Sequence, residues 1–234
     1  MNAIEPIFEK QFIYDSYSCR TGKGTHAGVA RLRRFLRQAS QNDSRKVWAL
    51  KCDISKFFAS VEHNKLLDLL SIKITDERTL DLLQEIINSF ESSPGLGIPL
   101  GNLTSQLFAN VYMHQFDFFV KHQLREKYYV RYCDDFVIVN EDRQHLLELL
   151  SPIREFLQSE LDLDLHPAKV SIRSWNEGID FLGYVLKPHA TLLRTKTKNR
   201  MLQKVNRQNL ASYLGVCSHA DSYETRQVLV SKVW

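Results

Sequence analysis

The chain has 234 residues, of which 44% are hydrophobic and 25% charged, so it is long enough for one sizeable globular core or two small ones. Its formal net charge of +4 is compatible with nucleic-acid binding but does not establish it. The cysteines Cys19, Cys52, Cys133 and Cys217 are widely spaced, which argues against a zinc site or a disulfide framework. We see no signal peptide and no bilayer-spanning run, so we expect a cytoplasmic protein with no membrane partner.

The first half of the chain is predicted to hold three helices and one strand. Residues 25–38 have apolar side chains on one helical face, and residues 61–70 and 76–90 show the same period. Residues 47–54 read as a strand that ends at Asp53. Residues 92–102 are rich in glycine and proline, which predicts a loop.

The second half centres on an acidic hairpin. A helix is predicted over 103–126, and residues 128–139 then place Asp134 and Asp135 between two β-prone stretches, where they favour a turn. A helix over 143–161 and short strands around 170–172 and 179–186 follow, and the rest is predicted to be helical and basic. This is the βαββαβ order of a ferredoxin-like sheet, with helices on one face and the other face left free for function.

Basic residues gather in two segments. One contains Arg31, Arg33, Arg34 and Arg37. The other runs from Lys187 to Arg207 without an acidic residue, and includes Lys196, Lys198 and Arg200. Such clusters indicate contacts with a phosphate backbone, and solvated helix faces are the alternative interpretation.

The acidic hairpin indicates a metal site. Adjacent carboxylates raise one another's pKa unless a cation lies beside them, and hard oxygen ligands suit magnesium. The strand ending at Asp53 should lie beside the hairpin, so that Asp53 and Asp134 could hold two metal ions between them. Two such ions can activate a 3′-hydroxyl and stabilise a leaving pyrophosphate, which requires positioning rather than a nucleophilic residue.

These acids and several flanking motifs resemble the reverse transcriptases over nearly the whole chain. Residues 132–135 (Tyr-Cys-Asp-Asp) look like the family's Tyr-x-Asp-Asp box, and residues 53–58 followed by 61–67 are similar to its first catalytic motif. Residues 20–26 resemble a fingers motif, 166–169 the motif after the palm helix, and 180–184 the primer grip. The implied fold is α+β, a right-hand polymerase with a ferredoxin-like palm, helical fingers and a short helical thumb.

The resemblance also implies the extent of each part. The fingers would span residues 1–47 and 73–103, the palm 48–72 and 104–186, and a partial or minimal thumb 187–234. Because the thumb is short, we expect weak grip on a template–primer duplex and low processivity without a partner. The basic segment 187–207 would then make the duplex contact.

Roles for individual residues follow from the same resemblance. Asp53, Asp134 and Asp135 would be catalytic, and two Mg²⁺ ions, with Mn²⁺ as a substitute, would be held by Asp53, the Ile54 backbone carbonyl and Asp134. The incoming nucleotide would be contacted by Arg20, Lys23, Phe58, Leu100, Gly101, Gln106 and Lys169. Template and primer would be contacted by Phe181, Leu182, Gly183, Lys196, Lys198 and Arg200.

Two of these residues carry a specific mechanism. Phe58 would be a steric gate whose ring excludes ribonucleotides, with Phe57 as the core aromatic beside it. Lys169 would protonate the leaving pyrophosphate, and a surface lysine is the alternative.

The loop at 97–106 departs from the family's common pattern, since Leu100 replaces a glutamine and Ser105-Gln106 replaces a Ser-Pro. This version resembles the reverse transcriptases of diversity-generating retroelements, which implies error-prone cDNA synthesis. Two interpretations of Leu100 stay open: it lowers base-selection fidelity, or it packs the loop. The implied partners are an RNA template, a DNA or RNA primer, dNTPs, a small basic accessory protein and a structured RNA, in a prokaryote or phage.

Other functions are compatible with parts of this pattern. A group II intron-like or defence-associated reverse transcriptase would share the acids. A non-catalytic RNA-binding scaffold with a palm fold would have no need of clustered acids, which repel phosphate. A nucleotide cyclase on a similar palm would require a ribonucleotide substrate, against which Phe58 argues.

Overall fold

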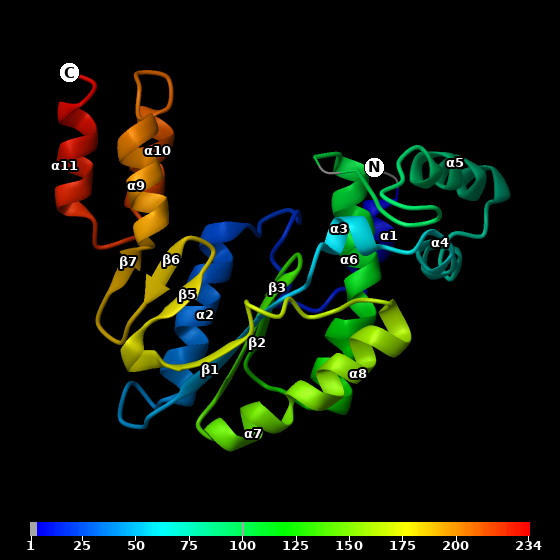
Figure 1. Ribbon diagram of the computed structural model, residues 1–234, viewed down its shortest axis with the longest axis horizontal. Coiled ribbons are helices and arrows are strands. Elements are labelled where there is room, and N and C mark those ends of the chain that lie inside the picture. Colours follow the sequence, from blue (N-terminus) through cyan, green and yellow to red (C-terminus); the bar gives the residue numbers. More distant parts are fainter. Residues whose placement is uncertain (1–3, 100) are drawn as a thin grey trace.

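The computed structural model describes residues 4–99 and 101–234, and Figure 1 shows how their helices and strands are arranged. The strands in these residues are β1 (Trp48–Asp53), β2 (Tyr129–Tyr132), β3 (Asp135–Asn140), β4 (Ser171–Ser174), β5 (Ile179–Phe181), β6 (Tyr184–Leu186) and β7 (Thr191–Leu193). The α-helices are α1 (Glu5–Glu9), α2 (Thr25–Ala39), α3 (Phe57–Ser60), α4 (His63–Ser71), α5 (Glu77–Asn88), α6 (Leu103–Phe118), α7 (Arg143–Glu148), α8 (Leu150–Leu161), α9 (Thr195–Lys204), α10 (Leu210–Cys217) and α11 (Tyr223–Ser231).

Four strands form the central sheet in the order β2-β3-β1-β4, with every neighbouring pair antiparallel. Helices α3 to α6 connect β1 to β2, and α7 and α8 connect β3 to β4. The predicted βαββαβ order is therefore confirmed. The register sets Asp53 of β1 directly opposite Asp135 of β3, so two of the predicted acids meet across neighbouring strands.

The two faces of this sheet are covered by different elements. Leu50, Cys52 and Phe136 point into one core together with apolar residues of α6 and α8. Ala49 and Val137 point into a second core that is shared with α2 and the small sheet β5-β6-β7. The expectation that this second face is left free is therefore wrong for its larger part, because the alternating residues of these central strands are apolar on both faces.

Two predicted helices differ from the observed ones. The helix predicted over 103–126 becomes α6 followed by a π-helical turn over Phe119–Gln123, and it ends where Arg125 adopts a left-handed φ of 58°. The helix predicted over 143–161 divides into α7 and α8. Pro152 has no N–H to donate to the Glu148 carbonyl, which explains the interruption at Leu149.

The small sheet is built on a tight turn. Phe181 of β5 pairs with Tyr184 of β6, so Leu182 and Gly183 form a two-residue connection in which both have positive φ (51° and 88°). Strand β7, which follows β6, lies in a segment where the sequence pattern gave no strand prediction. The three-residue length of β7 leaves too few positions for an alternating pattern.

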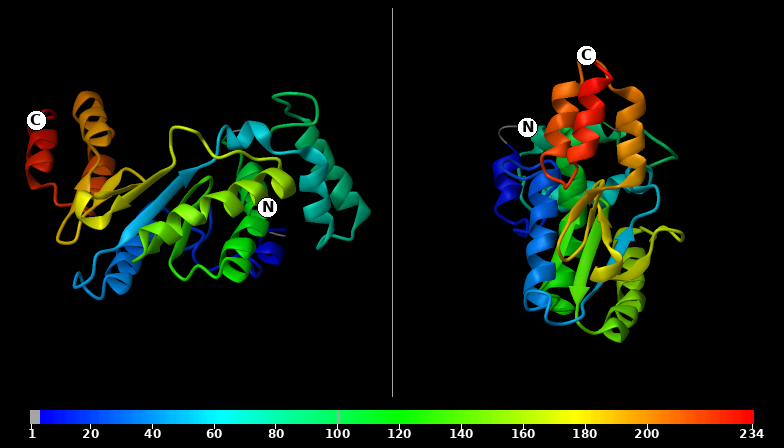
Figure 2. Two further views of the ribbon diagram at one scale, coloured as in Figure 1. Left: turned by 60° about the horizontal axis from the view of Figure 1, so that its bottom comes forward. Right: turned by 90° about the vertical axis from the view of Figure 1, so that its left-hand side faces the viewer.

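Helices α9, α10 and α11 extend from this small sheet at one end of the molecule, and α4 and α5 lie at the other (Figures 1 and 2). The helices α9–α11 share a small core of their own around Met201, Cys217 and Leu229. Among the described residues, no helix is both long and apolar enough to cross a bilayer.

Candidate active site

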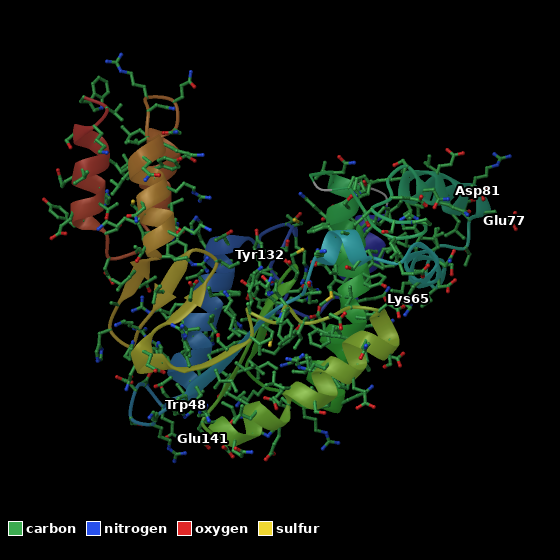
Figure 3. The ribbon with its side chains drawn as sticks, viewed as in Figure 1. Trp48, Lys65, Glu77, Asp81, Tyr132 and Glu141 are labelled. Carbon is green, nitrogen blue, oxygen red and sulfur yellow. The ribbon has the colours of Figure 1, made fainter. Side chains whose placement is uncertain are left out.

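The acidic turn is short and strained. Tyr132 pairs with Asp135, which leaves only Cys133 and Asp134 to connect β2 and β3. Cys133 has a φ of 56°, a left-handed conformation that costs a non-glycine residue about 1–2 kcal/mol. Strain that persists at one defined turn is typical of a functional position. In Figure 3, Tyr132 lies at one end of the central sheet, and Trp48 and Glu141 lie at the other. The end with Tyr132 is the one that faces α4 and α5 and also α9–α11.

The turn is tied to the end of β1. The Ile54 N–H donates to the Asp134 carbonyl at 3.1 Å, directly beyond the Asp53–Asp135 pair. The segment after α8 holds the other side of β1, since the His166 N–H donates to the Asp53 carbonyl at 2.8 Å. The structure thus brings Asp53, Asp134 and Asp135 together at one end of the central sheet, as the sequence predicts.

Two lysines lie against these acids. The Lys169 ammonium donates to Asp53 at 2.8 Å, which raises the pKa of Lys169. The Lys51 Nζ lies 3.3 Å from Asp135 Oδ2. Burial raises the pKa of Asp134, and the neighbouring Asp53 charge adds to that effect. Burial also raises the pKa of Asp135 to about 6, although Lys51 opposes the shift.

The chemistry of these donors fits a divalent cation. Asp135 Oδ1 is buried and has no hydrogen-bond partner among the described residues. Carboxylates whose ionisation is made costly by burial and by one another are stabilised by a cation. The described residues contain no group of three or more His, Cys, Asp or Glu side chains placed to hold a metal ion, so these side chains alone do not supply a complete set of ligands.

Phe58 lies close to this end of the central sheet, and the glycine-rich loop over residues 92–102 holds it. Phe57 is buried, as predicted for the core aromatic, whereas Phe58 is half-buried and meets the Phe57 ring edge-on. The Ile98 N–H donates to the Phe58 carbonyl at 2.7 Å, and His63 Nε2 lies 2.7 Å from the Gly97 carbonyl. The glycine-rich loop is therefore pinned to the start of α4. Leu100, which this loop carries, lies outside the described residues.

The predicted nucleotide residues of the first segment are engaged by protein groups. The Arg20 guanidinium contacts Glu9 at 2.7 Å and the Ile13 carbonyl at 2.7 Å, and its side chain is nearly buried. Lys23 is less enclosed, with its ammonium 2.9 Å from the Tyr14 carbonyl and over the Tyr14 ring. Of the two, Lys23 is the less enclosed, although burial still lowers the pKa of its ammonium.

Gln106 lies beside Arg20, and Gly101 is on the surface. Gln106 is in the second turn of α6 and lines a pocket of about 340 Å³ together with Arg20 and Asn110. Gly101 is exposed and has a φ of 93°, which only glycine adopts readily.

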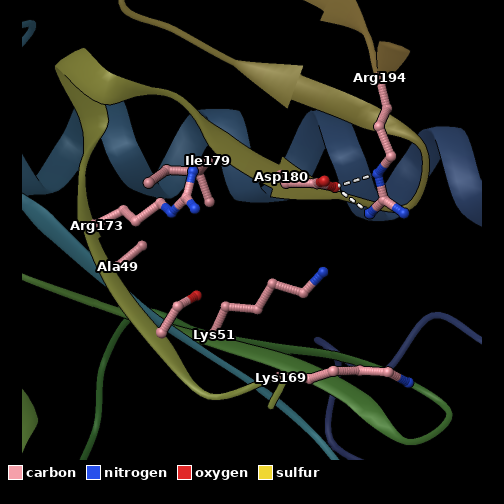
Figure 4. A pocket seen from close by; sticks show the side chains of 8 residues that line it. Ala49, Lys51, Lys169, Arg173, Ile179, Asp180 and Arg194 are labelled. Atoms are coloured by element: carbon pink, nitrogen blue, oxygen red, sulfur yellow. Dashed lines mark hydrogen bonds and ion pairs between the residues drawn. The ribbon is translucent and has the colours of Figure 1, made fainter. Parts of the chain in front are cut away.

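A second pocket, of about 270 Å³, lies beside the acids and is lined by Ala49, Lys51, Lys169, Ser171, Arg173, Ile179, Asp180 and Arg194 (Figure 4). Four of these side chains are cationic, and only Asp180, which Arg194 contacts, is acidic. The pocket therefore offers positive charge next to these acids, between the central sheet and β5.

The predicted template–primer residues occupy two places. Phe181 is fully buried in the core, so only Leu182 and Gly183 of that motif lie at the β5–β6 turn. Lys196 and Arg200 line an open surface groove on α9, and Lys198 is half-buried on the same helix.

Two of the four arginines in the cluster over residues 31–37 form hydrogen bonds within the protein. Arg31 donates to Asp15 at 2.7 Å, and Arg33 donates to the Thr191 hydroxyl at 2.9 Å. These contacts fix α2 to the loop before it and to β7. Arg31 and Arg33 therefore have a structural role in the folded chain, whereas Arg34 and Arg37 are exposed.

Sequence reasoning missed a buried ion pair beneath the acidic turn. Arg131 and Asp117 are both fully buried and lie 2.6 Å apart, and the Tyr129 hydroxyl also donates to Asp117 at 2.7 Å. The signal available in the sequence was Asp117 itself, an acid inside the otherwise apolar run 116–120.

Comparison with known proteins agrees with this arrangement. "Protein YkfC" of Escherichia coli is 26% identical over 222 residues, covering 79% of this chain and 58% of YkfC. "Group II intron-encoded protein LtrA" of Lactococcus lactis is 28% identical over 131 residues, covering 53% of this chain and 20% of LtrA. The chain thus spans little more than half of the one relative and a fifth of the other.

Solved structures show the same fold at low identity. The telomerase of Candida albicans, in complex with a fragment of telomeric RNA, has a TM-score of 0.65 at 11% identity and covers 99% of this chain and 44% of that one. A truncated apo telomerase of Candida tropicalis has a TM-score of 0.62, covering 82% of this chain and 44% of that one. The predicted α+β right-hand polymerase fold is therefore confirmed. The family model "Reverse transcriptase (RNA-dependent DNA polymerase)" matches residues 1–186, and the chain belongs to this family.

Proposed function

We propose that this chain is an RNA-directed DNA polymerase that extends a primer by metal-assisted nucleotidyl transfer. The observation that carries the proposal is the meeting of Asp53 and Asp135 across β1 and β3 with Asp134 in the strained turn beside them. A template-binding scaffold would not benefit from such acids, which repel phosphate. Membership of the reverse transcriptase family supports the same activity.

Asp53, Asp134 and the Ile54 carbonyl would hold two Mg²⁺ ions, for which Mn²⁺ can substitute. Such ions lower the pKa of the attacking hydroxyl and neutralise the phosphates. Asp135 would serve as a supporting acid, since it sits deeper and faces Lys51. Lys169 is within reach of Asp53 and would leave it to donate a proton to the pyrophosphate.

Substrate contacts are proposed for the remaining residues. Lys23 would contact the triphosphate, while Arg20 would hold the loop on which Lys23 lies. Phe58 would exclude the ribose 2′-hydroxyl, with Gly101 and Gln106 near the base pair. Leu182, Gly183, Lys196, Lys198 and Arg200 would contact template and primer, with fingers at 1–47 and 73–103, palm at 48–72 and 104–186, and thumb at 187–234.

Primer extension tests the proposal. The wild-type chain should extend a DNA primer on an RNA template with dNTPs and Mg²⁺, and Asp134→Ala should lower the rate by at least about 1,000-fold, because metal ligands supply several kcal/mol to the transition state. Asp81→Ala, which removes an exposed acid from α5 (Figure 3), is the matched control and should behave as wild type. Equal rates for wild type and Asp134→Ala would contradict the assignment.

We further propose that the enzyme belongs to the error-prone, diversity-generating class, working with an accessory protein and a structured RNA in a prokaryotic or phage cell. This rests on the loop sequence at 97–106, where Leu100 cannot offer the hydrogen bond of an amide. The relatives encoded by group II introns keep the alternative class in view.

Fidelity measurement separates the two classes. Leu100→Gln should reduce misincorporation opposite template adenine by about tenfold, since one hydrogen bond contributes about 1 kcal/mol or more to discrimination. Sequencing of the cDNA products of both variants reads this directly. Unchanged error spectra would leave Leu100 as a packing residue.

A further inference from the structure

The buried Arg131–Asp117 pair under the acidic turn also contacts the backbone of the turn. Arg131 places Nε and Nη2 on the two oxygens of Asp117, at 2.7 and 2.6 Å. These bonds engage two of the three guanidinium nitrogens, and Nη1 is left for another acceptor. That nitrogen donates to the Cys133 carbonyl at 2.9 Å.

Cys133 is the strained residue of the turn, so this contact has a specific consequence. A left-handed peptide relaxes unless its surroundings fix it, and the charged donor fixes its carbonyl. The neighbouring carbonyl, that of Asp134, is held by the Ile54 N–H. The two carbonyls of the turn therefore have one anchor each, in β2 and just after β1.

Arg131 also connects the turn to the amino-terminal loop. Its backbone N–H donates to the Asp15 carbonyl at 3.0 Å, and its carbonyl accepts from the Tyr17 N–H at 2.9 Å. Arg20 in turn binds the Ile13 and Ser16 carbonyls, at 2.7 and 3.0 Å. The loop that leads to Lys23 is thus attached, through backbone bonds, to β2, the strand that leads into the acidic turn.

We infer that Arg131 is the positioning residue of this active site: paired with Asp117, its guanidinium orients the Cys133–Asp134 turn. The inference rests on the proposed polymerase function for its kinetic readout. Arg131 itself reaches no substrate, because it is fully buried. Its effect is exerted through the backbone of the turn, and a shift of about 1 Å there is enough to reduce the rate of chemistry about 100-fold.

The test must separate positioning from stability. Removing Asp117 alone would leave a buried, unpaired arginine and unfold the chain, so we replace the whole group: Asp117→Leu, Tyr129→Phe and Arg131→Met in one variant. Exchange of a buried ion pair for apolar side chains of similar volume is often neutral for folding. Arg131→Lys is the second variant, because an ammonium has no planar fork to serve Asp117 and Cys133 together. Arg154→Lys on the exposed side of α8 is the control.

Three measurements are made on each variant: the thermal unfolding midpoint, kcat and KM for dNTP in primer extension, and amide hydrogen exchange of the peptide covering 129–136. The triple variant should fold, lose about 100-fold in kcat, keep KM for dNTP within about threefold, and exchange faster across the turn. Arg131→Lys should show a smaller loss with the same split, and Arg154→Lys none.

A triple variant with wild-type kcat would overturn the inference, and so would a loss of kcat with unchanged exchange in the turn. If the triple variant does not fold, Arg131→Lys decides, and wild-type kcat in it overturns the inference. A wild-type chain that extends no primer contradicts the polymerase function instead, and the exchange measurement still tests whether Arg131 orders the turn.

Discussion

At the scale of residues, Asp135 has an environment unlike that of the other two acids. It is enclosed by the sheet, faces Lys51 at 3.3 Å, and has one oxygen without a partner among the described residues. An acid in such a place pays a desolvation cost that Lys51 only partly offsets. The buried Asp135 carboxylate therefore lowers the stability of the folded chain, and a bound cation would offset that cost.

Removing this carboxyl should stabilise the metal-free protein at neutral pH. Burial raises the pKa of Asp135 from 3.8 to about 6. The folded chain then binds more protons than the unfolded chain between these values, so stability falls as pH rises through this window. Asp135→Asn, measured by urea unfolding in EDTA, should be more stable than wild type at about pH 7.5 by roughly 1–3 kcal/mol, and by less at about pH 5.

Asp81→Asn, an exposed acid on α5, should show no such difference between the two pH values. If Asp135→Asn were the less stable protein at the higher pH, the cost of ionising Asp135 would have the wrong sign.

At the scale of elements, the sequence predicts the sheet order and the three acids because both follow from short-range patterns. β-prone residues predict β1, the acidic turn predicts the hairpin, and apolar periodicity predicts α2, α4 and α5. The Arg131–Asp117 pair is different. Its members lie on a helix and a strand that meet only through the tertiary fold, so no local pattern joins them. The covering of the second sheet face by α2 is hidden for the same reason.

Helix α9 carries basic side chains that have no acidic partner among the described residues. Lys196 and Arg200 line its open groove, and neither forms an ion pair with a described acid. Changing both to glutamine should weaken template–primer binding and lower the slope of log affinity against log salt by about two, since each lost phosphate contact removes roughly one released counterion.

Fluorescence anisotropy at several salt concentrations measures that slope. Lys127→Gln, located before β2 at the end away from the acidic turn, is the matched control and should leave the slope unchanged. If the double variant kept the wild-type slope of log affinity against log salt, the duplex would have to bind elsewhere on the molecule.

At the scale of the whole molecule, the fold sets one end of the central sheet between two helical parts. Tyr132, which pairs with Asp135 at the acidic turn, lies at that end, with α4 and α5 to one side and α9–α11 to the other (Figures 1 and 3). The cationic pocket lies between the acids and the small sheet from which α9 extends.

The most direct test of the account is single-nucleotide extension of a DNA primer on an RNA template, with wild type beside Asp53→Asn. Asp53 comes from β1 and the other acids from the hairpin, so the account requires both strands for one reaction. We predict Mg²⁺-dependent addition by wild type and a loss of at least about 1,000-fold in Asp53→Asn, with both proteins folded. Equal addition by the two proteins would contradict the account.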